Sequence, residues 1–301
     1  MFAFLDSAED TVHAPHNAAD TLHAVAGHGG THGDDAGGNL FTELLRHVQD
    51  SHELELPFIG HIGLPHFEPV HLAGLTIDFS ITKHVVFLWV AAAILIIVAI
   101  NAARQNQRNR IPRGFGNLME VFVQFIRDEI VIPNMGPKGA KYMPYLLTTF
   151  FYILIMNLLG LIPYGASATG NVSVTAGLAI IAFIMIQAAA IKAQGIGHYL
   201  AHLTGGVHWA LWPIMIPIEI LGLFTKPFAL CIRLFANMTG GHIVIVSLIG
   251  LIFIFQSYFI AVGPVGFVLG INFLELFVAF LQAYIFTMLT SLFMGLGMHT
   301  E

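Results

Sequence analysis

The run T-K-P-F-A-L-C-I-R-L-F-A-N-M-T-G-G-H, Thr225–His242, decides the fold, because it places an arginine inside a long apolar segment. That segment extends from about residue 209 to residue 255 and is long enough to cross a bilayer. An arginine keeps its proton at every accessible pH, and a charge inside a membrane is costly. Arg233 therefore predicts an ion pathway or a counter-charge, and the rest of the chain should show what it faces.

The composition excludes a soluble globular domain, because 56% of the 301 residues are hydrophobic and only 10% are charged. We predict an all-α integral membrane protein with about five transmembrane helices and one amphipathic helix on the cytoplasmic surface. The single cysteine, Cys231, excludes an internal disulfide and a thiolate metal cluster. The sequence contains no internal repeat of the kind that builds inverted-repeat transporters.

The N-terminal part, residues 1–80, is predicted to form a His-rich tail and a short cover segment on the outer side. Residues 1–40 lack helical or strand periodicity, and their histidines match no defined ligand spacing, so we predict no metal site. Phe41–Leu56 is interpreted as a short surface helix, and residues 57–79 as an extended or hairpin-like cover. Residues 81–301 form the polytopic membrane domain.

Val85–Ala103 is the first span, and four of the twelve basic residues follow it directly: Arg104, Arg108, Arg110 and Arg113. The positive-inside rule places this loop in the cytoplasm and the N-terminus outside. We therefore expect a multi-pass protein of the bacterial plasma membrane. Asn117–Val131 has apolar residues at helical spacing but is too polar to span, which predicts an amphipathic helix on the cytoplasmic surface.

Pro144–Pro163 and Val174–Ala190 form a pair of spans joined by a short polar turn. Asn157 is the one amide inside the first of them, and we favour helix–helix hydrogen bonding over ligand binding for it. Counting crossings from an outer N-terminus places the polar loop Lys192–Val207 in the cytoplasm.

The last two apolar segments, Leu211–Phe255 and Val265–Met298, both exceed one crossing. As helices they would be ~65 and ~50 Å long, against a hydrocarbon core of ~30 Å. Steep tilting resolves this mismatch. We predict a tilted hairpin that turns near Gly263-Pro264 on the outer side and ends in the cytoplasm.

Polar residues form one stripe on the first helix of this hairpin. Glu219, Lys226 and Arg233 are spaced by seven residues, and Asn237 follows at four. Seven steps of about 100° nearly return to one face. His242, nine positions after Arg233, points about half a turn away.

Glu275 and Gln282 share a face on the second helix. If Gln282 lies level with Arg233, antiparallel pairing brings Glu275 level with His242. A carboxylate and an imidazole at one depth can exchange protons. With Glu219 toward the cytoplasmic end, titratable groups lie on both sides of an arginine that does not titrate. This pattern indicates two half-channels separated by an electrostatic barrier.

Simpler roles remain open for several of these residues. Lys226, beside Pro227, is best interpreted as a side chain that snorkels to the cytoplasmic interface. Asn237 suits a structural role as well as a functional one. Gln282 suits a helix–helix hydrogen bond, and a buried bridge between Arg233 and Glu275 is an alternative to a pathway.

Three motifs carry a specific resemblance: P-F-A-L-C-I-R-L-F-A-N-M-T-G-G-H (Pro227–His242), K-Y-M-P-Y-L-L-T-T-F-F-Y-I-L-I-M-N-L-L-G-L-I-P (Lys141–Pro163) and L-Q-A-Y-I-F-T-M-L-T (Leu281–Thr290). They resemble subunit a of the F-type ATP synthases, in order and over about residues 75–298. Residues 1–70 have no counterpart in this pattern.

The resemblance implies a proton-conducting stator subunit whose tilted hairpin clasps the ring of c subunits. It implies as further partners the b-subunit stalk, the remaining ATP synthase subunits and membrane lipid, with no nucleic acid, cofactor or metal. The chain would not be an enzyme on its own, and it contains no P-loop. The residues implied in proton translocation are the essential arginine Arg233, the nearby Asn237 and Gln282, Glu219 in the cytoplasmic half-channel, and His242 with Glu275 in the outer one; Lys226 and Asn157 are secondary candidates.

Two other classes of protein compete with this interpretation. An independent secondary transporter or channel with an intramembrane arginine site predicts inverted repeats and a carboxylate of its own opposite Arg233. A His-rich periplasmic metal sensor with a membrane anchor does not explain why two thirds of the chain is polytopic.

Overall fold

The computed structural model describes residues 53–56, 60–63, 70–72, 75–77, 82–108, 114–162, 168–197, 199, 212–255 and 258–299. The expected His-rich tail lies outside these ranges, as does most of the surface helix expected in Phe41–Leu56.

Two antiparallel hairpins precede the first membrane helix, formed by β1 (Glu53–Leu56) with β2 (Gly60–Gly63) and by β3 (Val70–Leu72) with β4 (Leu75–Ile77). In the first hairpin Leu56 is paired with Gly60, and in the second Leu72 with Leu75. They agree with the hairpin-like cover expected after residue 57. The surface helix prediction was wrong over Glu53–Leu56, because the E-L-E-L run alternates with a period of two, which suits a strand.

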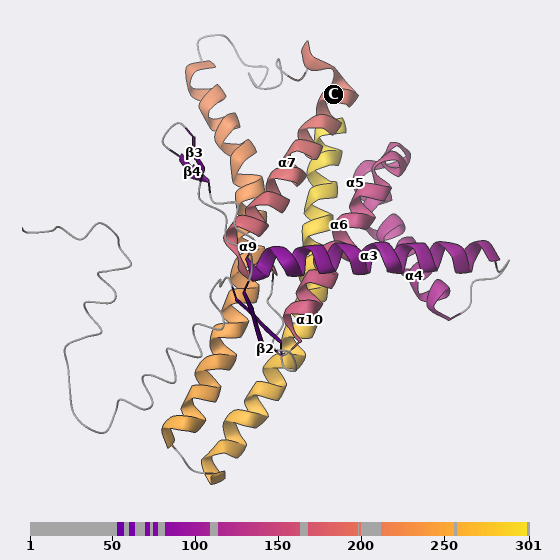
Figure 1. Ribbon diagram of the computed structural model, residues 1–301. Coiled ribbons are helices and arrows are strands. Elements are labelled where there is room, and N and C mark those ends of the chain that lie inside the picture. Colours follow the sequence, from indigo (N-terminus) through magenta and orange to yellow (C-terminus); the bar gives the residue numbers. More distant parts are fainter. Residues whose placement is uncertain are drawn as a thin grey trace, which may run out of the picture.

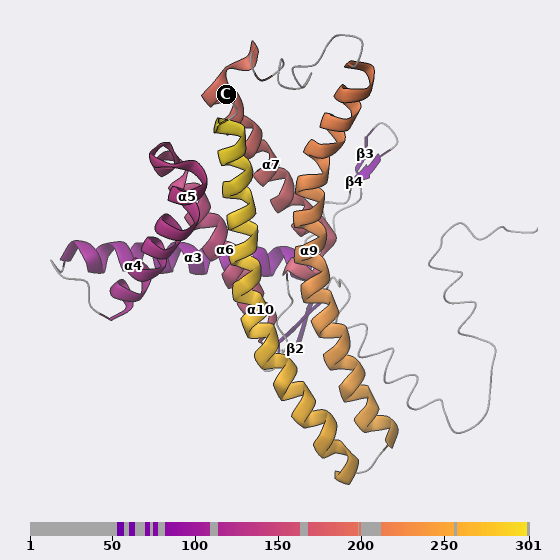
Figure 2. The same ribbon diagram turned by 180° about the vertical axis from the view of Figure 1, so that it is seen from behind.

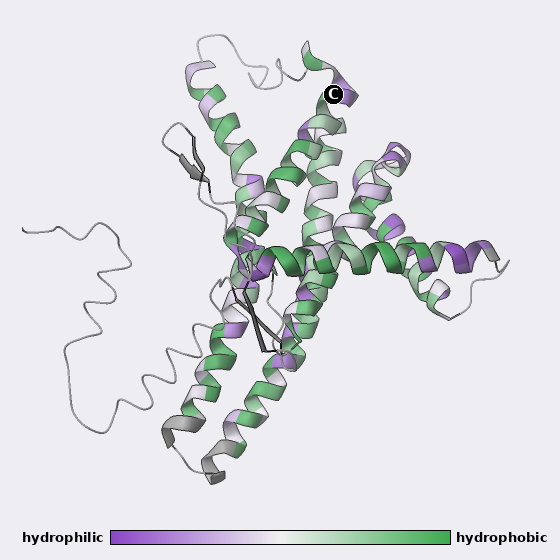
Figure 3. Ribbon diagram, viewed as in Figure 1, coloured by the Kyte–Doolittle hydropathy of each residue, from purple (hydrophilic) through white to green (hydrophobic). Residues whose placement is uncertain are grey.

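In the described part of the chain, five helices are long and apolar enough to cross a membrane: α3 (Lys83–Arg108), α6 (Met143–Gly160), α7 (Val172–Gln194), α9 (Trp212–Phe255) and α10 (Tyr258–His299). Figure 3 shows them mostly in the colour of hydrophobic residues. This confirms the predicted all-α membrane fold with five spans and two long final helices.

The antiparallel pair α9 and α10 is the longest feature of the protein (Figures 1 and 2). Helix α7 packs on both members of the pair, and α6 packs on α10. The end of the pair that contains the turn projects beyond these helices, and its apolar side chains are open: Val262, Phe267 and Phe273 are 74%, 70% and 76% exposed. Helix α3 runs across the pair in both views.

The hairpin turns earlier than the sequence suggested. Helix α9 ends at Phe255 and α10 begins at Tyr258, so Gly263-Pro264 lies inside α10. Pro264 is the seventh residue of its helix and lacks one backbone N–H, a loss that transmembrane helices tolerate.

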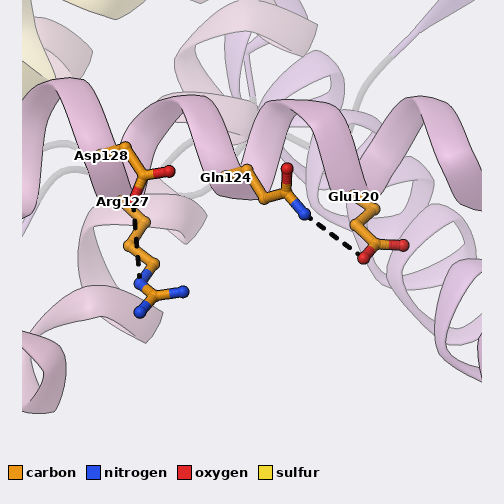
Figure 4. A network of polar contacts seen from close by, with 4 residues as sticks. All are labelled: Glu120, Gln124, Arg127 and Asp128. Carbon is orange, nitrogen blue, oxygen red and sulfur yellow. Dashed lines mark hydrogen bonds and ion pairs between the residues drawn. The ribbon is translucent and has the colours of Figure 1, made fainter.

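The predicted amphipathic helix divides into α4 (Phe115–Phe125), a π-helical turn η1 (Ile126–Val131) and the short α5 (Ile132–Met135). Its polar side is exposed, as expected: Gln124 donates to Glu120 at 3.4 Å, and Arg127 lies 3.9 Å from Asp128 (Figure 4). Its C-terminal half, however, packs against α10, and the side chains of Ile126, Ile130, Val131 and Met135 are buried. The 3-10 turn η2 (Pro137–Lys141) then leads into α6.

Aromatic side chains join α4, α6 and α10 into one core. Phe122 has its ring centroid 6.2 Å from Phe150 and 6.1 Å from Phe280, and Phe150 lies 5.8 Å from Phe280. Polar links hold the remaining helices: the Tyr152 hydroxyl donates to the carbonyl of Leu88 at 3.1 Å, and Gln194 donates to the carbonyl of Gly297 at 2.6 Å.

Gly295 marks a close approach of α10 to α5. A Cβ atom at Gly295 would overlap the backbone carbonyl of Asn134, whose carbon would lie only 2.8 Å away. One turn earlier, Ser291 donates to the carbonyl of Ile130 at 3.2 Å. The backbone at this contact has little freedom to move, so the missing side chain sets the distance between the two elements.

We expect Gly295→Ala to lower the stability of the assembled complex by about 1–3 kcal/mol, because the added methyl group forces α10 away from Asn134. Thermal unfolding in detergent measures this. Gly177→Ala is the control, since a Cβ at Gly177 in α7 meets nothing within 4 Å. Equal stability of both variants would contradict the close contact.

Candidate functional site

The predicted polar stripe lies on α9, on a side that is largely open. Glu219 and Lys226 are half-buried, while Arg233 and Asn237 are exposed. Within the described part of the chain, no carboxylate forms an ion pair with Arg233. The alternative of an internal Arg233–Glu275 bridge therefore finds no support, and the guanidinium is available to a group from outside the chain.

Small residues surround Arg233 on the same face. Ala229, Ala236 and Gly240 precede or follow it by four, three and seven residues, and all three are exposed. Small side chains allow the backbone of another helix to approach closely within a membrane. This face combines a fixed positive charge with room for a neighbouring helix.

Asn237 and Gln282 join α9 to α10 beside the arginine. The Asn237 amide donates to Gln282 Oε1 at 2.7 Å, and Gln282 is 2% exposed. Gln282 thus lies level with Asn237. The pairing predicted from the sequence assumes that it lies level with Arg233, which is one helical turn earlier on α9. Lys226, eleven residues before Asn237, lies 5.0 Å from the ring of Phe293, eleven residues after Gln282. Two independent contacts therefore agree on the antiparallel register.

Glu275 lies against the bare backbone of α9 at Gly241. A Cβ at Gly241 would overlap the Glu275 carboxylate, with the carboxyl carbon only 2.9 Å away. Gly241 precedes His242, so Glu275 and His242 lie at one level, as predicted, and both are half-buried. Gly241 is not among the site residues predicted from the sequence; its signal is the Gly240-Gly241 pair inside a long apolar helix.

Asn157 fixes α10 next to this level. It donates to the carbonyl of Ala279 at 3.3 Å and accepts from the Thr169 hydroxyl at 2.9 Å, and it is fully buried. Ala279 is one turn from Glu275. The amide thus makes the helix–helix hydrogen bond expected for it, and supports the position of the carboxylate.

The site therefore has three levels along the α9–α10 pair. Glu219 lies about 20 Å from Arg233 along the axis, and His242 and Glu275 lie on the opposite side of the arginine. Carboxylates and an imidazole accept and release protons, whereas the guanidinium does not. This order suits transfer of protons to and from an external acid that passes Arg233.

Comparison with known proteins gives a consistent result. Residues 85–295 match the family described as ATP synthase A chain. The chain is 52% identical over 262 residues to ATP synthase subunit a of Chloroherpeton thalassium, covering 86% of this chain and 77% of that protein. It is 48% identical over 313 residues to ATP synthase subunit a 2 of Chlorobaculum tepidum, covering 98% and 87%. It is 48% identical over 295 residues to ATP synthase subunit a of Anaeromyxobacter dehalogenans, covering 94% and 76%.

We expect Gly241→Ala to reduce proton transport by the assembled complex about tenfold to a hundredfold, because the new methyl group displaces the Glu275 carboxylate. ATP-driven acidification of proteoliposomes measures the change. The control is Gly266→Ala, on α10 half a turn away from the Glu275 face, where a Cβ meets nothing within 4 Å.

The double variant Gly241→Ala/Glu275→Asp tests the cause of the loss, since the shorter acid leaves room for the methyl group. It should transport protons faster than Gly241→Ala alone. Wild-type transport by Gly241→Ala would show that the position of Glu275 does not matter.

Proposed function

Because this chain belongs to the ATP synthase A chain family, the proton-conducting stator subunits of the Fo sector, we propose that α9 and α10 carry its two proton half-channels. It is a multi-pass membrane protein of a bacterial ATP synthase and catalyses no ATP chemistry itself. Membership of this family also excludes the two other classes of protein considered, an independent transporter and a metal sensor.

The unpaired Arg233 is the observation that carries the proposal. A guanidinium on an exposed face of an apolar helix, with no carboxylate partner in the described part of the chain, needs an external anion. The carboxylates of a c-subunit ring meet this need, and Ala229, Ala236 and Gly240 allow a ring helix to approach. The Asn237–Gln282 hydrogen bond holds α10 beside the arginine without neutralising it.

Protons enter from the outer side past His242 and Glu275 and neutralise a ring carboxylate. A neutral carboxyl group can rotate through lipid, whereas a carboxylate cannot. When the ring completes its turn, Arg233 favours the charged form, and the released proton leaves past Glu219. Each charge that crosses supplies about 2.3 kcal/mol per 100 mV, so one ATP requires several.

The orientation follows from the basic residues. Arg104 and Arg108 lie in the last turns of α3, and Arg110 and Arg113 come directly after it. By the positive-inside rule they favour a cytoplasmic side for this end of α3, with residues 1–80 on the periplasmic side and the C-terminus inside. Lys226 lies at the cytoplasmic part of α9, over Phe293. The b-subunit stalk is the further stator partner in this arrangement.

We expect Arg233→Ala to abolish ATP-driven acidification of proteoliposomes that contain the whole complex. Passive proton leak should rise once the soluble ATPase part is removed, because no fixed charge then separates the half-channels. The control is Leu221→Ala, an exposed apolar side chain of α9 outside the polar stripe, which should retain pumping. Assembly is checked by native gel electrophoresis, and pumping by an intact Arg233→Ala complex would overturn the barrier role.

The outer pair should tolerate exchange of its two members. The family resemblance includes bacterial members with Glu on the first helix and His on the second, whereas this chain has the reverse order. We expect the double variant His242→Glu/Glu275→His to pump within about tenfold of the wild type, and either single variant to pump less. The rate of acidification measures all three. A double variant as inactive as the singles would argue against a shared proton-exchange role.

A further inference from the structure

Helices α7 and α9 have a defined antiparallel register. Thr175 Oγ1 lies 3.4 Å from Cys231 Sγ, and the stacked rings of Phe183 and Phe224 have centroids 5.9 Å apart. From the first contact to the second, the chain advances eight residues along α7 and goes back seven residues along α9, as antiparallel helices require. About one further turn along both helices reaches Gln187 on α7 and Glu219 on α9.

Gln187 accepts a hydrogen bond from Tyr199, which lies beyond the end of α7. The Tyr199 hydroxyl donates to Gln187 Oε1 at 2.5 Å, across twelve residues. The chain reverses at Gly195, whose φ of 82° lies in the left-handed region that favours glycine, and the N–H of Tyr199 bonds to the carbonyl of Gly195 at 3.0 Å. This reversal folds Tyr199 back over the end of α7.

Electrostatics links Tyr199 to the same carboxylate. Burial, and secondly the charge of Glu219, raise the pKa of Tyr199 above its ordinary value, so the phenol stays protonated and remains a donor. The other ionisable side chains described on α7 and on this part of α9 are Lys192 and Lys226, and Lys226 lies over Phe293. Glu219, Gln187 and Tyr199 thus converge on one place at the cytoplasmic end of the α7–α9 contact.

We propose that Gln187 and Tyr199 are positioning residues for Glu219 and form with it the cytoplasmic mouth of the proton path. The inference rests on the proposed role of Glu219. Tyr199 occupies the Gln187 oxygen, so the amide N–H groups are what Gln187 can offer to the ionised Glu219 carboxylate across the α7–α9 contact. The hydrogen bond holds the acid in one place while it passes protons to the cytoplasm.

The test measures passive proton flux through Fo in membranes stripped of the soluble ATPase part, with the pH of each side varied separately. Tyr199→Phe and Gln187→Leu should each lower the flux about three- to tenfold and shift its dependence on cytoplasmic pH. The dependence on outer pH should stay unchanged. The double variant should be no slower than the slower single, because both changes break one network.

Tyr152→Phe is the matched control. It also removes one tyrosine hydroxyl hydrogen bond, the one to Leu88 at 3.1 Å, but it lies between α6 and α3, away from the polar stripe. Its flux and both pH profiles should equal those of the wild type.

Glu219→Gln separates this inference from the function on which it rests. Wild-type flux in Glu219→Gln would overturn the half-channel assignment and the inference together. If Glu219→Gln slows the flux while Tyr199→Phe and Gln187→Leu behave as wild type, the inference alone fails. It also fails if these two variants only lower thermal stability, because the bond would then merely pin the loop after α7.

Discussion

The fixed charge of Arg233 is the constraint on which the rest of the molecule depends. It lies on an exposed face of α9 and forms no ion pair with a carboxylate in the described part of the chain. A protein that only needed to fold would place a hydrophobic residue there, because a membrane charge costs free energy and adds no packing. The surrounding features make sense around this charge: small neighbours that leave room, a neutral Asn237–Gln282 bond beside it, and titratable groups kept away from it.

The register of α9 against α10 determines which side chains lie beside Arg233 and which lie beside His242. Three contacts of different kinds set this register. They are the Asn237–Gln282 hydrogen bond, the cation–π contact of Lys226 with the Phe293 ring, and the packing of the Glu275 carboxylate against the backbone of Gly241. Asn157 adds an anchor at Ala279 from a third helix. Amides and a glycine hold the helices together at this site, and among the described residues no ion pair contributes there.

Sequence reasoning succeeded where one helix was enough to decide. The seven-residue spacing of Glu219, Lys226 and Arg233 defines a face on any helix, and apolar length defines a span. It failed where two elements compete for the same residues. Gly263-Pro264 resembled a turn but is helical, and E-L-E-L at residues 53–56 forms a strand. The amphipathic segment has the exposed polar side expected of it, but its own pattern did not reveal that Ile126 and Ile130 are buried where the segment packs against α10.

By itself, the sequence determined the membrane class, the five spans, the polar stripe and the chemistry of each candidate residue, because these depend on composition and on the fixed geometry of a helix. Only the tertiary structure decided that Gln282 meets Asn237 rather than Arg233, that Gly241 receives Glu275, and that Tyr199 returns to Gln187. A register between helices depends on side-chain fit along the whole contact. A shift of a single turn changes every partner while it leaves each helix's own pattern intact.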